Sequence, residues 1–135
     1  MSGEDWISQF QDPVLSESVP EEVRALFEVA RGSLTYGYFF YPLYALAGEQ
    51  LTRVAEAAIS AKSKLLGAPK KLTFEKQLKF LLDKKALTEQ QHSDWDRLRK
   101  LRNEFSHPKQ QNILPPGAVS LLLGGVADKI NALFD

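Results

Sequence analysis

The stretch that decides the fold is Trp95-Asp96-Arg97-Leu98-Arg99-Lys100-Leu101-Arg102-Asn103-Glu104-Phe105. Its large apolar residues recur at intervals of three and four, which places them on one face of a helix: Trp95, Leu98, Leu101 and Phe105. Just upstream, Thr88 followed three residues later by Gln91 is typical of a capped helix start. Pro108 disfavours helical dihedral angles at His107. The sequence therefore predicts a helix that starts at Thr88 and ends at His107.

Glycine and proline divide the rest of the chain into further helical segments. Apolar spacing predicts helices over residues 20–31 and 35–64, a third from Thr73 that ends around 83–85, and a last over about 117–134. We expect Ser18 to cap the first of these, which should stop near Gly32, and Thr73 to cap the third. Pro42 marks either a kink in the second helix or its true start.

These segments define the fold class. No segment alternates polar and apolar residues with the period of a strand, so we expect an all-α protein, a four- to five-helix antiparallel bundle. Residues 1–19 are interpreted as an N-terminal arm and residues 20–135 as the helical bundle domain. The 135 residues suffice for one hydrophobic core.

Two local patterns have more than one interpretation. Six aromatic residues between Tyr36 and Tyr44 suit a stacking platform for bases, but a core or a dimer interface is the commoner use of such a cluster. Gly124-Gly125 weakens the last helix by roughly 1 kcal/mol per glycine relative to alanine. Close packing of that helix against another backbone would explain the two glycines.

Composition excludes several kinds of site. The chain has no cysteine, which excludes disulfides and thiolate metal sites, and its two histidines are too few for a histidine-built zinc site. We therefore expect no metal and no cofactor. No apolar run is long enough to cross a membrane, and the first residues lack the features of a secretory signal, so the expected location is cytoplasmic.

The formal net charge of zero conceals an asymmetry. Residues 1–56 hold three arginines, no lysine and nine acids, a balance of −6, whereas residues 57–135 have a balance of +6. A net charge of zero argues against a protein that coats DNA non-specifically, but it is compatible with a local basic groove. A dipolar chain that stacks acidic on basic surface in a dimer is the alternative.

Candidate functional residues lie at the end of the decisive helix. Arg102 can hold a phosphate through a planar fork of donors, and histidine, here His107, can move a proton near neutral pH. On an ideal helix Arg102 lies about 50° from the centre of the apolar stripe, and Arg102 and His107 are about 140° apart. Since they do not share a face, either the helix unwinds before Pro108 or a second chain completes the site.

Arg102-Asn103, three further residues and His107 resemble the signature of the HEPN superfamily, all-α domains that include many RNA-cleaving toxins. The similarity covers roughly residues 35–134 and includes Glu49 within the long helix. In that family the arginine and histidine are the catalytic pair, and two copies typically build one composite site. The resemblance thus implies a homodimer with Arg102, Asn103 and His107 as catalytic residues.

The implied reaction is metal-independent cleavage of RNA by an endoribonuclease. His107 would be the general acid or base, Arg102 would stabilise charge on the phosphate, and Asn103 would orient one of them. Nearby cations would bind the flanking RNA backbone: Arg97, Arg99, Lys100 and Lys109. The resemblance further implies a toxin or defence effector, with a protein antitoxin or partner subunit encoded elsewhere.

A non-catalytic alternative explains the same residues. Arg102 would pair with Glu49 or Glu56 on the long helix, and His107 would satisfy carbonyl groups at its helix end. The chain would then be a helical interaction module or a nucleotide-binding module. A solvent-open groove that joins Arg102 and His107 of two subunits favours the nuclease, and a buried Arg102–Glu49 ion pair favours the interaction module.

Overall fold

The computed structural model describes residues 13–36, 43–105 and 116–135, and all of their regular structure is helical. It has the helices α2 (Glu21–Tyr36), α3 (Leu43–Leu65), α4 (Phe74–Asp83), α5 (Glu89–Phe105) and α6 (Pro116–Phe134). The predicted all-α helical bundle is therefore confirmed. The expected aromatic cluster falls mostly outside the described residues, and Tyr36, which is described, is exposed at the end of α2.

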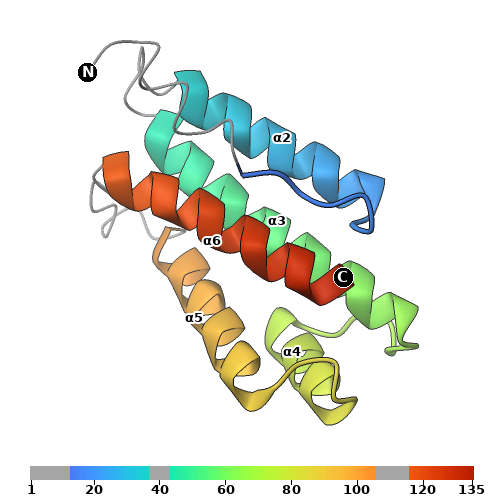
Figure 1. Cartoon of the computed structure of the whole chain (residues 1–135). Helices are drawn as coiled ribbons and strands as arrows, with labels where there is room; N and C mark the ends of the chain where they lie inside the picture. The colour runs from blue at the N-terminus through green and yellow to red at the C-terminus, as the bar shows by residue number, and fades with distance from the viewer. Residues whose placement is uncertain (1–12, 37–42, 106–115) are drawn as a thin grey trace.

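Helix α3 is the centre of the bundle, because it packs against all four other helices. Its buried residues are spaced as an apolar helical stripe: Ala47, Leu51, Val54, Ala55, Ala58 and Ile59. The pairs α2–α3 and α4–α5 run antiparallel, whereas α6 lies beside α3 and runs in the same direction (Figure 1). The hydrophobic core therefore lies on both sides of α3.

Helix α2 starts one residue later than predicted, and its predicted cap is wrong. The helix begins at Glu21, where the carbonyl oxygen of Pro20 accepts hydrogen bonds from the backbone N–H groups of Val23 and Arg24. The hydroxyl of Ser18 does not cap it and instead donates to Asp135 Oδ1. The sequence could not indicate this partner because Asp135 lies 117 residues further along the chain.

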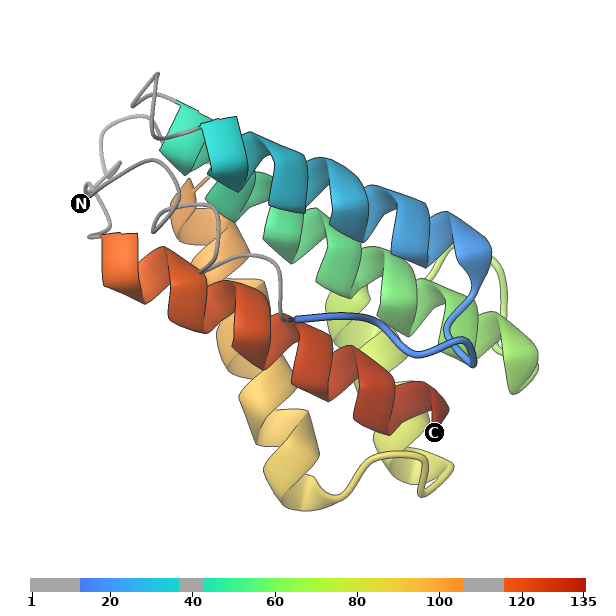
Figure 2. The same cartoon turned by 45° about the horizontal axis from the view of Figure 1, so that its top comes forward.

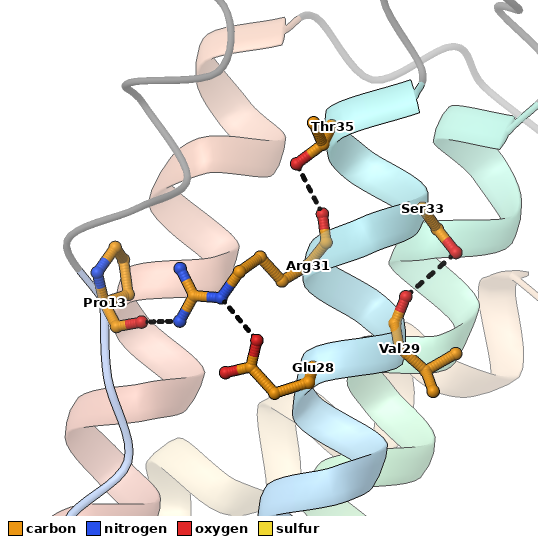
Figure 3. Close-up of polar contacts among 6 residues, drawn as sticks. All are labelled: Pro13, Glu28, Val29, Arg31, Ser33 and Thr35. Atoms are coloured by element: carbon orange, nitrogen blue, oxygen red, sulfur yellow. Dashed lines mark hydrogen bonds and ion pairs between the residues drawn. The ribbon is translucent and has the colours of Figure 1, made fainter.

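The predicted end of α2 near Gly32 was also wrong, since the helix continues to Tyr36 and includes Thr35, the expected start of the next one. Leu34 is fully buried, and its burial offsets the roughly 1 kcal/mol that Gly32 costs relative to alanine. Ser33 and Thr35 donate their hydroxyls to the carbonyl oxygens four residues earlier (Figure 3). Helix α3 is described from Leu43 onward, and the predicted role of Pro42 lies outside the described residues.

The helix starts of α4 and α5 follow the sequence closely. Thr73 caps α4, and its hydroxyl accepts from the backbone N–H of Lys76 at 3.3 Å. Before α5, the N–H of Gln91 donates to the Thr88 hydroxyl at 3.1 Å, and the N–H of Thr88 donates to Gln91 Oε1 at 2.9 Å. Both predicted caps are confirmed, and the second fixes where α5 begins.

Residues 13–19, here called the strap, run alongside α6, between α6 and α2, before turning into α2 (Figure 2). The strap buries Leu15 and Val19 in the core. Its backbone is held at Pro13, whose carbonyl oxygen accepts a hydrogen bond from the Arg31 guanidinium, and Arg31 also pairs with Glu28 at 3.1 Å (Figure 3). The division between an arm at 1–19 and a domain at 20–135 stays a prediction, but the described part of that arm packs on the bundle.

Asn131 on α6 clamps the strap through two hydrogen bonds. Its Oδ1 accepts from the backbone N–H of Ser16 at 2.7 Å, and its Nδ2 donates to the carbonyl oxygen of Val14 at 2.9 Å. Since each such bond contributes about 0.5–1.5 kcal/mol, we expect Asn131→Ala to lower the free energy of unfolding by about 1–3 kcal/mol in urea titrations. Asn131→Asp keeps the acceptor but places a carboxylate oxygen against the Val14 carbonyl oxygen, so it should be no more stable than Asn131→Ala. An Asn131→Ala protein as stable as the wild type would contradict the clamp.

Candidate functional site

The candidate site is built on α5, and the core determines where this helix lies. Trp95 and Leu98 are buried, and α5 packs on both α3 and α4. Arg102 and Asn103 belong to its last helical turns, as the sequence predicted. The side chains of residues 102–105 lie outside the described part of the structure, and so do His107 and Lys109. The structure thus places the motif's helical half at the carboxyl end of α5 and leaves the pairing of Arg102 with His107 a prediction.

Three of the predicted RNA-binding residues are described, and each has an acidic neighbour on α5. Arg97 is 76% exposed, and its guanidinium lies 4.0 Å from Asp94. Arg99 and Lys100 share one carboxylate, because Arg99 Nε lies 2.8 Å from Asp96 Oδ1 and Lys100 Nζ lies 3.3 Å from Asp96 Oδ2. Asp96 therefore offsets part of the positive charge that the sequence suggested for this helix.

The hydrogen bond from Arg99 holds the pKa of Asp96 below its ordinary value, with a further contribution from Lys100 and some opposition from burial. A carboxyl whose pKa is lower in the folded than in the unfolded chain stabilises the fold above its unfolded pKa, and that stabilisation disappears as pH falls through the folded pKa.

We therefore expect Asp96→Asn to be less stable than the wild type at pH 7, by less than about 1 kcal/mol because the ion pairs lie near the surface. The difference should shrink as the pH is lowered below about 4, where the wild-type carboxyl also becomes protonated. Thermal unfolding of both proteins across this pH range tests the prediction. A stability difference that does not change with pH would show that the ion pairs are not its cause.

The two acids proposed as structural partners of Arg102 both lie on α3. Glu49 Oε1 accepts a hydrogen bond from Arg53 at 2.8 Å, one turn further along the helix. Glu56 lines a hollow of about 400 Å³ between α3 and the start of α4, together with Ser60 and Gln77. Pairing of Arg102 with either acid stays a prediction, and Glu49 is already engaged by a cation of its own helix.

A groove between α5 and α6 was missed by the sequence reasoning. Both helices pack on α3 but barely contact each other, which leaves a hollow of about 300 Å³ between them. We call this the α5–α6 groove and define it by its lining residues: Leu98, Leu101, Leu121, Leu122, Gly125, Val126 and Lys129. The sequence signal for this groove was Leu121, an apolar residue that lies outside the buried stripe of α6. In the structure the Leu121 side chain is 79% exposed.

The expectation that Gly124 and Gly125 pack closely against another backbone is wrong for the described residues. A Cβ atom at Gly124 would have no described neighbour within 4 Å. One at Gly125 would meet only the Nζ of Lys129, at 3.9 Å, which is an ordinary contact with a flexible side chain. Packing within the described chain therefore does not explain why two glycines interrupt α6.

No family model, curated protein or solved structure matches the chain. Among the described residues, no three acidic or histidine side chains lie close enough together to hold a metal ion. None of the described helices combines the length and apolar character needed to cross a membrane. The features of the described chain that bear on function are α5, the groove beside it and the sequence motif at its end.

Proposed function

We propose that the chain is a HEPN-like, metal-independent endoribonuclease whose site is completed by a second copy. The observation that carries the proposal is the position of Arg102 and Asn103 in the last turns of α5, a helix held by a capping box at its start and by buried Trp95. The backbone of a helix packed in the bundle gives a phosphate-binding arginine a defined point of attachment.

In the proposed reaction the ribose 2′-OH attacks the adjacent phosphorus atom. His107 accepts the proton of the hydroxyl as the new P–O bond forms. The P–O5′ bond breaks, and the leaving 5′-oxygen takes that proton back from His107. Arg102 stabilises the charge on the phosphate oxygens, and Asn103 orients His107 or the phosphate. The products are a 2′,3′-cyclic phosphate and a 5′-hydroxyl.

Arg97 supports the proposal as a cation for the flanking RNA backbone, because it is exposed and its ion pair with Asp94 is long. Lys109 is proposed for the same task from its place in the sequence. Arg99 and Lys100 contribute less, since both contact Asp96. In the biological setting that the resemblance implies, the enzyme is a cytoplasmic toxin or defence effector restrained by a protein antitoxin.

The second candidate is a non-catalytic interaction module, and two observations favour it. The charges of Arg99 and Lys100 are offset within α5, and the α5–α6 groove offers an apolar surface to a protein partner. This candidate needs neither an exposed Arg102 nor a mobile proton at His107.

Cleavage of a mixed RNA pool by the wild-type protein in EDTA separates the two candidates. The nuclease predicts fragments that carry cyclic phosphate and 5′-hydroxyl ends, identified by whether phosphatase or kinase treatment changes their mobility. Intact RNA at every protein concentration at which the chain is dimeric would overturn the nuclease. Fragments with 5′-phosphate ends would overturn the proposed chemistry.

A further inference from the structure

Helices α2 and α6 both pack on α3, but within the described residues they make almost no direct contact with each other. The strap lies along the seam between them, here called the α2–α6 seam (Figure 2). Two strap side chains, Leu15 and Val19, fill the seam and are buried, whereas Val14 is 62% exposed. The strap therefore covers an apolar seam that the two helices alone would leave open to solvent.

The strap is held by side chains of the bundle and not by regular secondary structure. Asn131 on α6 accepts a hydrogen bond from the backbone N–H of Ser16 and donates one to the carbonyl oxygen of Val14. Arg31 on α2 donates to the carbonyl oxygen of Pro13. An amide that pairs with a carbonyl and an N–H two residues apart recognises the main chain of a non-helical peptide, whatever its side chains. Both helices thus supply groups that bind peptide backbone.

A second group of contacts secures the turn at the end of the strap. The hydroxyls of Ser16 and Ser18 both donate to Oδ1 of Asp135, which directly follows α6. The backbone N–H of Val19 donates to the carbonyl oxygen of Ser16 at 3.1 Å and closes the turn. Hydrogen bonds from Ser18 and Ser16 hold the pKa of Asp135 below its ordinary value, so they stabilise its ionised form. The contacts with Asp135 lie at the surface, where water can replace them when the strap lifts.

The strap contributes less to the core than the helices do. It buries two apolar side chains, whereas the described part of α3 buries six. Segments with few buried apolar contacts and no helical or sheet hydrogen bonds open at a lower free energy than the whole domain. Lifting the strap also leaves the packing of α3 against the four other helices in place. The strap can therefore open while the bundle remains folded.

We propose that the α2–α6 seam is a peptide-binding site that the strap closes from within the same chain. The strap is both the lid of this site and its built-in ligand, and the open seam accepts a non-helical peptide segment of another protein. That segment needs apolar side chains at the positions of Leu15 and Val19, four residues apart. Hydroxyl groups at the positions of Ser16 and Ser18 add donors to Asp135. The inference does not rest on the proposed nuclease.

Native-state hydrogen exchange of the full chain, followed by NMR in urea concentrations below unfolding, tests the lid. The N–H groups of Ser16 and Val19 are the probes, because both are hydrogen-bonded only while the strap is closed and turned. They should exchange at least about tenfold faster than the slowest amides of α3, at rates that hardly change with urea, because opening a short segment exposes little surface. Exchange of the strap together with α3, with the same urea dependence, would overturn the lid.

Binding of a labelled synthetic peptide with the sequence of residues 13–20 tests the seam, and Leu15→Asp in the full chain should leave that seam open. A strap open about one per cent of the time, at an effective concentration on the order of 1 mM, corresponds to a dissociation constant of about 10 µM for the same segment added separately. Fluorescence anisotropy should show this affinity for Leu15→Asp. The wild type should bind the peptide about a hundredfold more weakly, because its own strap competes.

Val14→Asp is the matched control, since it introduces the same charge at the neighbouring strap residue, whose side chain is exposed. It should bind the peptide as weakly as the wild type. Adding Asn131→Ala to Leu15→Asp should weaken peptide binding by about fivefold or more, because both backbone hydrogen bonds are lost. A peptide that itself carries Asp in place of Leu15 should not bind.

Three results would contradict the proposal. Loss of the helical circular dichroism of Leu15→Asp would show that the bundle does not stand without the strap, so that the strap is no lid. Peptide binding to Leu15→Asp no tighter than to the wild type would remove the peptide site. Equal binding of the two peptides would show that the position of Leu15 is not recognised. None of these measurements involves RNA, so their outcome is separate from that of the nuclease proposal.

Discussion

Trp95→Ala should lower the free energy of unfolding by about 3–5 kcal/mol, the usual effect of truncating a buried tryptophan. The Trp95 side chain is among the largest fully enclosed ones in the described core, with 2% of its surface exposed, and it holds α5 against the rest of the bundle. Since domains of this size have a total stability of roughly 5–15 kcal/mol, the loss would remove a large part of it.

Urea unfolding followed by circular dichroism at one fixed protein concentration measures this loss. Leu65→Ala is the control, because Leu65 is 70% exposed at the end of α3 and its truncation should change stability by no more than about 0.5 kcal/mol. The free energy of unfolding of Trp95→Phe should lie between those of Trp95→Ala and Leu65→Ala. Trp95→Phe should remain folded even if Trp95→Ala does not fold. A Trp95→Ala protein within about 1 kcal/mol of the wild type would contradict the assigned core.

His107→Ala should lower the rate of RNA cleavage by about 10²–10⁴-fold, which is the usual contribution of a general acid or base. The expected cause is loss of proton transfer, both from the attacking 2′-hydroxyl and to the leaving 5′-oxygen. The affinity for RNA should change much less than the rate, because Arg102 and the surrounding cations remain. Single-turnover cleavage and a separate RNA-binding titration distinguish the two quantities.

The matched control is His92→Ala, since His92 is the chain's other histidine and lies near the start of α5, far along the helix from the motif. It should cleave RNA at the wild-type rate. Equal rates for His107→Ala and the wild type would remove His107 from the mechanism.

Local sequence patterns predicted those features that depend on neighbouring residues. The caps at Thr73 and Thr88 each join a side chain to a backbone group three residues away, and both were predicted correctly. The sequence did not predict that α2 continues past Gly32, because the burial of Leu34 within the bundle stabilises this last part of the helix. The contact of Ser18 with Asp135 was missed because it joins distant parts of the chain.

The same distinction applies to the candidate site. The helical placement of Arg102 and Asn103 followed from apolar spacing along α5. Arg99 and Lys100 lie three and four residues after Asp96, a spacing that brings all three side chains together on a helix. Their shared contact with the Asp96 carboxylate could therefore have been predicted from the sequence, but it was not. The α5–α6 groove could not be predicted from spacing along one helix, because it depends on how far apart α5 and α6 lie when both pack on α3.

In the proposed reaction, Arg102 of one copy and His107 of another act on the same phosphate. Two inactive variants, Arg102→Ala and His107→Ala, test it when they are combined in one dimer by coexpression. Half of the dimers would then be mixed, and each mixed dimer would contain one intact site, so the mixture should regain about a quarter of the wild-type cleavage rate. A mixture as inactive as its two components, although sedimentation shows that mixed dimers form, would contradict a site shared between copies.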